Sequence, residues 1–200
     1  MNRCVVRGLL LCIAVGAWST AGAAALPLYM KVVGSKQGQI RGEVTTPGWE
    51  DWVGGLGFHY AVTSPVGAAG QAAGKRQHSA VVVTKRLDRA SPLLFSALAG
   101  DEVLPSVELR FVRGAQAGTQ VAFFTIKLTN ARVVSIEQRV EPPGLPGDQG
   151  AGDPREDVSF VFEKIELTFA DGGITAMDDW GAAAASSTLN VPVIRRRATP

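Results

Sequence analysis

Histidine, serine and paired carboxylates are the side chains of this sequence that could do chemistry, and their spacing argues against it. His59 and His78 are the only histidines, and neither lies in an H-x3-H or H-E-x-x-H pattern of the kind that binds zinc. No G-x-S-x-G motif provides the turn that exposes a hydrolase serine. The sequence therefore predicts no catalytic, cofactor-binding or metal-binding residue, and a protein that is not an enzyme.

Two further patterns are also poor candidates for a site. Residues 69–76 resemble a phosphate-binding loop around Gly74, but they lack its first glycine and its final Ser or Thr. The adjacent acidic pairs Glu156-Asp157 and Asp178-Asp179 would point to opposite faces of a strand, so neither pair can jointly hold one ion or proton. We expect both pairs to be solvated.

The elements that carry these residues are predicted to be mostly strands, because apolar and polar residues alternate in several stretches. The apolar faces are Leu28, Met30 and Val32; Leu56, Phe58, Tyr60 and Val62; Val107, Leu109 and Phe111; and Phe124, Ile126 and Leu128. Between Val158 and Phe169 the apolar positions change parity, which indicates a bulge near Glu163-Lys164 or a bend from one sheet into another. The predicted fold is mainly β, a small β-barrel of two sheets.

One short flanking α-helix is predicted after residue 90. Ser91 can cap it, Pro92 suits its first position, and Gly100 can end it in a left-handed conformation. Leu94 and Leu98 give the helix an apolar stripe at helical spacing. We expect this stripe to pack against the barrel.

Three regions follow from the composition along the chain. Residues 1–25 have a basic start, a short apolar run and a small-residue cleavage site, as in a secretory signal peptide. Residues 26–180 form the predicted barrel domain, and residues 181–200 form a flexible tail rich in Ala, Ser and Arg. Cleavage after Ala25 would remove both cysteines, Cys4 and Cys12, and with them any disulfide.

The charge balance excludes a protein that binds nucleic acid through bulk positive charge. The chain has 20 Lys and Arg against 18 Asp and Glu, and two of those basic residues, Arg3 and Arg7, lie in the predicted signal peptide. The apolar run of the signal is too short to span a bilayer, so no stable membrane insertion is expected.

A loop over residues 45–55 carries two tryptophans, Trp49 and Trp52, beside the acidic residue Asp51. Tryptophan side chains in a loop normally need burial. Either they fold back onto the barrel or another subunit covers them.

Several short motifs occur in an order that is typical of one protein family. They are Leu26-Pro27-Leu28-Tyr29-Met30-Lys31, Gly48-Trp49-Glu50-Asp51-Trp52, Phe58-His59-Tyr60, residues 84–92, and Phe162-Glu163-Lys164-Ile165. In this order they resemble the haemolysin-coregulated protein (Hcp) family, the tube proteins of type VI secretion. The resemblance covers roughly residues 26–180.

The resemblance implies a small barrel of which six copies form a ring with a central pore, and rings that stack into a tube carrying secreted effectors. The implied partners are other copies of the chain, in a homohexamer and in stacked rings, and effector cargo in the pore. The loop with the two tryptophans would match the family's extended loop, and the small outward residues of the next strand would suit close subunit approach. The subunit-contact candidates are Trp49, Asp51, Trp52, Gly57, His59 and Ala61.

One feature departs from the family, whose members ordinarily carry no signal peptide. We therefore expect a non-catalytic, ring-forming structural protein that is periplasmic or secreted, and cytoplasmic before secretion if the signal is not used. The alternative is a monomeric secreted β-barrel that binds a small apolar ligand. Phe58, Phe111, Phe124 and Phe160 argue against a ligand cavity, because their side chains would fill a small barrel.

Overall fold

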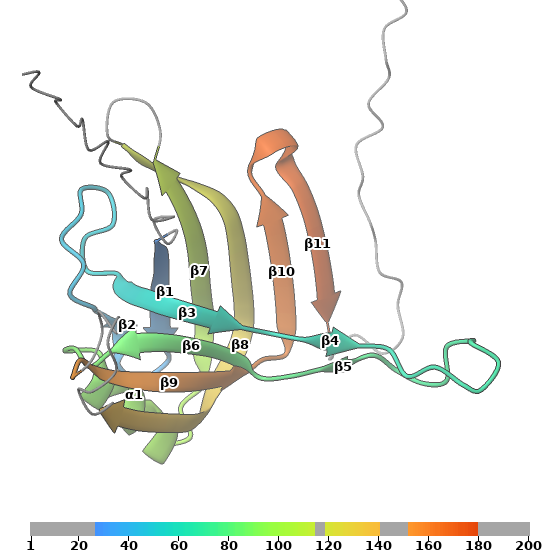
Figure 1. Ribbon diagram of the computed structural model, residues 1–200. Coiled ribbons are helices and arrows are strands. Elements are labelled where there is room, and N and C mark those ends of the chain that lie inside the picture. The colour runs from blue at the N-terminus through green and yellow to red at the C-terminus, as the bar shows by residue number, and fades with distance from the viewer. Residues whose placement is uncertain (1–26, 115–118, 141–151, 180–200) are drawn as a thin grey trace, which may run out of the picture.

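The computed structural model describes residues 27–114, 119–140 and 152–179, in which strands predominate and α1 is the one α-helix (Figure 1). The predicted signal peptide (1–25) and tail (181–200) lie outside the described residues. The elements, in chain order, are β1 (Leu28–Gly34), β2 (Gly38–Ile40), β3 (Val53–His59), β4 (Val62–Thr63), β5 (Gln77–His78), β6 (Val81–Arg86), α1 (Ser91–Ala99), β7 (Leu104–Gly114), β8 (Gln120–Val140), β9 (Pro154–Val161), β10 (Lys164–Phe169) and β11 (Ile174–Asp179).

Six strands close into a barrel, which confirms the predicted fold class. The main sheet runs β11-β10-β8-β7-β1-β3-β6-β9, and β9 also pairs with β8, so the sheet returns on itself. The pairs within this sheet are antiparallel, and β10 and β11 continue it beyond the barrel from the edge of β8 (Figure 1). Closure leaves the six barrel strands without an open end to the sheet.

The 21-residue strand β8 makes this closure possible because it changes partner along its length. Residues 124–129 pair with β10, whereas residues 132–140 pair with β9. Asn130, between the two parts, has a positive φ of 49°. The chain turns after Val161 from β9 into β10, and this bend accounts for the predicted parity change between Val158 and Phe169.

The apolar face predicted for residues 56–62 was wrong at Leu56 of β3 and at Val62 of β4, which are 49% and 52% exposed. The pairing of β3 with β6 is irregular between Gly55 and Gly57, so Leu56 is an extra residue in the ladder. Such a bulge shifts the alternation of the strand by one residue. Phe58 beyond the bulge packs against the core as expected.

Helix α1 lies where it was predicted, but both of its ends differ from the prediction. Ser91 is its first residue and makes no N-cap hydrogen bond; the Asp88 carboxylate instead accepts one from the backbone N–H of Ala90. Gly100 has a φ of −93°, and the left-handed residue is Asp101 (φ 45°). A short polar side chain tolerates that conformation, so glycine was not required there.

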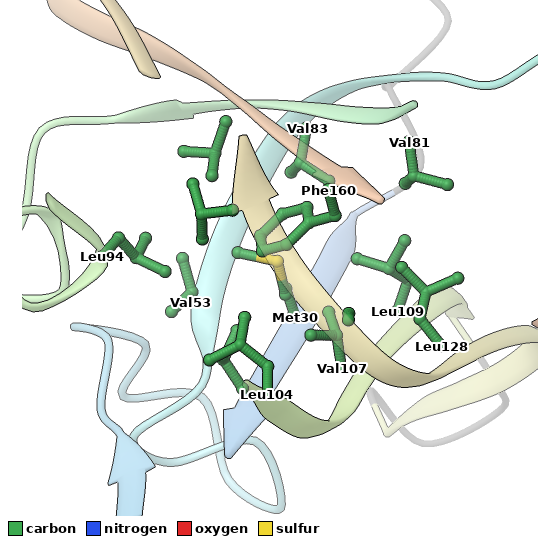
Figure 2. Close-up of a cluster of buried hydrophobic side chains, with 14 of the residues drawn as sticks. Met30, Val53, Val81, Val83, Leu94, Leu104, Val107, Leu109, Leu128 and Phe160 are labelled. Carbon is green, nitrogen blue, oxygen red and sulfur yellow. The ribbon is translucent and has the colours of Figure 1, made fainter. Parts of the chain in front are cut away.

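The barrel interior is a packed hydrophobic core (Figure 2). Met30, Leu109 and Phe160 come from three different strands, and none of them is exposed to solvent. Leu94 of α1 is also fully buried, so the helix covers the barrel through its predicted stripe. These side chains occupy the space that a bound apolar ligand would need.

Candidate functional site

The tryptophan loop (residues 41–52) packs on the outer face of its own barrel. Trp49 is 6% exposed, its ring centroid lies 5.0 Å from that of Tyr29, and both belong to a cluster with Val112. Trp52 meets Trp49 edge to face at 5.2 Å and keeps part of its surface open. The first of the two alternatives is thus observed for Trp49, which its own chain covers.

Backbone hydrogen bonds hold this loop in place. The N–H of Gly42 donates to the carbonyl of Asp51 at 2.8 Å, and the N–H of Val44 donates to the carbonyl of Trp52 at 3.1 Å. A side chain at Gly42 would put its Cβ 2.3 Å from the Trp52 carbonyl oxygen. Glycine is therefore needed at this position, because the two ends of the loop approach each other too closely for any other residue.

Charged side chains lie on both sides of the loop. The Asp51 carboxylate accepts a hydrogen bond from Arg89 and lies 3.7 Å from an Arg41 nitrogen. The Arg110 guanidinium and the Lys31 ammonium lie 5.1 Å and 5.9 Å from the ring centroid of Trp52. Half-buried Trp52 is thus an aromatic surface with two cations beside it, and both tryptophan and arginine are enriched at protein interfaces.

The other three predicted contact residues lie apart from the tryptophan loop. Gly57 and His59 pair with Thr84 and Val82 of β6, and the His59 side chain points outward and is exposed, as predicted. Ala61 follows β3 and exchanges hydrogen bonds with Ser79 at 2.9 Å. The six candidates therefore fall into two groups, one on the loop and one on and just after β3.

Among the described residues, the segment that extends furthest from the barrel is a two-stranded arm (residues 60–79), not the tryptophan loop (Figure 1). It contains β4, β5 and a tip closed by a bridge between Val66 and Ala72. The match of the tryptophan loop to the family's extended loop stays a prediction. Residues 67–74 indicated only an exposed connection, because Gly and Ala carry no strand signal.

Four polar side chains at the base of the arm form a cluster that the sequence analysis missed. His78 Nε2 lies 2.8 Å from an Asp178 oxygen, the other ring nitrogen shares a hydrogen bond with the Tyr60 hydroxyl, and Arg76 donates two hydrogen bonds to Asp178. Hydrogen bonds from Arg76, opposed by partial burial and aided by His78, lower the pKa of Asp178 to about 2. The prediction that Asp178 is simply solvated was wrong.

The prediction for Glu156 was also wrong, because this carboxylate is fully buried in the barrel. Lys85, equally buried, places its Nζ 2.8 Å from Glu156 Oε1, 2.6 Å from an Asp88 oxygen and 3.1 Å from Ser91 Oγ. Burial would raise the pKa of Glu156, but contacts with Lys85 and Gln138 outweigh it and leave the pKa below its ordinary value. This network joins β6 and β9 to the start of α1.

One long strand edge in the described part of the sheet lacks a partner. β11 pairs with β10 on one side, and no described strand pairs with its other side. Ile174 and Met177 on this strand are 49% and 44% exposed, and Val66 on the arm is 70% exposed. An open edge with apolar side chains is a surface that another chain can cover.

The described residues contain no cluster of three His, Cys, Asp or Glu side chains placed to hold a metal ion, and no helix of theirs has the length and apolar character needed to cross a bilayer. A depression of about 400 Å³ beside the tryptophan loop is lined partly by Glu43, Glu50, Asp51 and Arg89. Such a charged lining does not suit the small apolar ligand of the alternative hypothesis.

Residues 29–169 match the family described as "Type VI secretion system effector, Hcp", which is well over half of the chain. The chain belongs to the Hcp family. Membership confirms the resemblance of the ordered motifs and assigns the chain to a family of structural tube proteins of type VI secretion, not to an enzyme family.

Sequence and structure relatives agree with this assignment. The "Major exported protein" of Pseudomonas aeruginosa is 37% identical over 166 residues, which cover 78% of this chain and 96% of that protein. A crystal structure of an Hcp protein has a TM-score of 0.71 at 31% identity and covers 78% of this chain and 98% of the other. The secreted protein Hcp3 of P. aeruginosa has a TM-score of 0.61 at 34% identity, over 78% and 99% of the two chains.

Proposed function

We propose that this Hcp-family chain is an exported, non-catalytic subunit of a six-membered ring, and that its rings can stack around a pore that holds cargo. The observation that carries the proposal is the closed barrel, which has one long open edge among its described strands, at β11, flanked by the projecting arm. A barrel of this kind offers different surfaces on its two sides, and head-to-tail contacts between unlike surfaces generate closed rings.

Three exposed features are the proposed contact surfaces between copies. They are the β11 edge with Ile174 and Met177, the arm with Val62 and Val66, and the half-exposed Trp52 beside its two cations. Gly57, His59 and Ala61 supplement them as small or polar positions around the base of the arm. Asp51 contributes by holding the tryptophan loop through Arg89.

We expect the double variant Ile174→Lys, Met177→Lys to weaken association between copies about tenfold or more. Both side chains are exposed in the single chain, so the free energy of unfolding should change by at most about 0.5 kcal/mol. Lysines on a strand edge oppose pairing with another chain, because their charge must then lose its water. Native mass spectrometry over a concentration series measures the six-copy species.

Val134→Lys is the matched control, because Val134 is 47% exposed on β8, outside the β11 edge. The control should assemble like the wild-type chain. A wild-type chain that stays monomeric at high concentration contradicts the ring, and equal assembly of all three proteins contradicts the assignment of β11 as a contact.

The export step is supported by the signal-like residues 1–25 and by the relatives named as exported or secreted proteins. We expect the protein recovered from the periplasm or medium to begin at Leu26. Cell fractionation followed by N-terminal sequencing measures this. A cytoplasmic chain that retains Met1 would contradict signal-directed export and leave the ring proposal standing.

A further inference from the structure

The strand pairing within the arm (residues 60–79) is too short to fix the orientation of the arm relative to the barrel. β4 and β5 pair through two residues each, and the next contact, between Val66 and Ala72, is a single bridge. An isolated two-stranded ribbon of this kind is marginally stable in water. Whatever fixes the arm relative to the barrel must therefore lie at its base.

The base of the arm packs on the barrel through three rings. Tyr60 and His78 stack at a centroid distance of 6.0 Å, and Phe162 meets His78 edge-on at 5.8 Å. Phe162 lies between β9 and β10, so the two sides of the arm share one small aromatic cluster with the end of the barrel. Aromatic contacts resist separation, but they leave the angle of the arm adjustable.

The polar cluster fixes that angle. Arg76 lies on the arm just before β5 and donates through Nε and one terminal nitrogen to both oxygens of Asp178, a geometry that permits one relative orientation. The same carboxylate lies 2.8 Å from His78 Nε2. Because a carboxylate only accepts, this ring nitrogen carries the proton, and in the neutral ring the other nitrogen accepts from the Tyr60 hydroxyl.

Asp178 belongs to β11, the strand with the open edge, and it is 100 residues away from His78 in the sequence. Two of the three proposed contact surfaces, the arm and the β11 edge, thus meet at one carboxylate. We propose that Asp178 is a positioning residue that locks the arm to β11, so that a neighbouring copy meets both as one rigid surface. This inference rests on the proposed function, and it names the device that orients its contacts.

Spin-label distances measure the direction of the arm directly. Labels are placed through Ala69→Cys at the arm tip and Ser96→Cys on α1, both exposed, in the full chain with Cys4→Ser and Cys12→Ser. We expect a narrow distance distribution for the labelled chain that carries no further substitution. Asp178→Asn and Arg76→Gln should each broaden it, and the two together should add little, because both remove the same interaction.

Asp101→Asn is the matched control. Asp101 pairs with Arg132 at 2.6 Å in an exposed ion pair of the α1–β7 turn, and asparagine tolerates its positive φ. This variant should keep the narrow distribution. Thermal unfolding of all variants should stay within a few degrees of wild type, which separates release of the arm from loss of the fold.

Native mass spectrometry then links arm direction to assembly. We expect Asp178→Asn and Arg76→Gln to weaken association several-fold, because a neighbouring copy must then order the released arm as it binds. Unchanged distance distributions in both variants would overturn the proposal that Asp178 locks the arm to β11. A broadened distribution with unchanged assembly would overturn its role in presenting the contact surface. A wild-type chain that never assembles would instead refute the ring, while the distances still decide whether Asp178 holds the arm.

Discussion

Glu156→Ala is expected to lower the free energy of unfolding by about 3–5 kcal/mol, as measured by urea denaturation. The variant leaves the ammonium of Lys85 in a fully buried position without its carboxylate partner on β9. An uncompensated buried charge costs much more than the intact pair contributes. Asp88, 9% exposed, remains at 2.6 Å and offsets only part of that cost.

Two further variants define the origin of this effect. The double variant Lys85→Met, Glu156→Leu removes both charges and should be close to wild type in stability, since apolar residues of similar size can replace a buried pair. Asp153→Ala breaks the exposed pair with Arg86 and should cost no more than about 1 kcal/mol. If the double variant were as unstable as the single one, packing would explain the loss, and the charge argument would fail.

The same pair gives a direction for the pH dependence. The pKa of Glu156 is lower in the folded chain than its ordinary value of 4.5, so its ionised form stabilises the fold. That contribution is complete above pH 4.5 and declines as the pH falls further. The wild-type chain should therefore lose more stability on acidification below pH 4.5 than the double variant does.

Phe160→Ala is expected to lower the free energy of unfolding by about 3–5 kcal/mol, because it opens a cavity at the centre of the barrel. Phe160 is fully buried and lies beside Met30 in the core (Figure 2). It also pairs with Val81 of β6 and Val133 of β8, so the cavity borders the strands that close the barrel. Urea denaturation with an unchanged m-value measures the loss.

Phe169→Ala is the same substitution at the end of β10, where the ring is 38% exposed. It should cost about 1 kcal/mol, since less of its surface is removed from water than at Phe160 and its removal leaves no closed cavity. Similar losses for the two variants would show that the barrel centre is not the main source of stability.

The strands were predictable because apolar and polar residues alternate along a half-buried strand, so the sequence indicates which face is buried. The alternating residues of β1, β7 and β8 face the core as expected. The bulge at Leu56 could not be predicted, because an extra residue in a ladder depends on the partner strand. The N-cap predicted for α1 was wrong for a related reason. Ser91 makes hydrogen bonds with Asp88 and Lys85 instead of capping the helix.

The candidate contacts were only partly predictable. Trp49 and Trp52 were identified as loop residues that need burial, but only the three-dimensional contacts show that Tyr29 covers the first of them. Asp178 and Glu156 were set aside because neighbours in sequence point to opposite faces. Their real partners, His78 and Lys85, lie about 100 and 70 residues away, beyond the reach of local patterns.

The partner change along β8 also determines which segments close the barrel. The barrel closes only when residues 154–161 insert between β6 and the far half of β8, so most of the chain has been made before the last gap is filled. Pairings between such distant segments require large loops to be ordered first and are slow to form. We therefore expect closure of the barrel to be a late and slow step of folding, which follows the synthesis of residues 154–161.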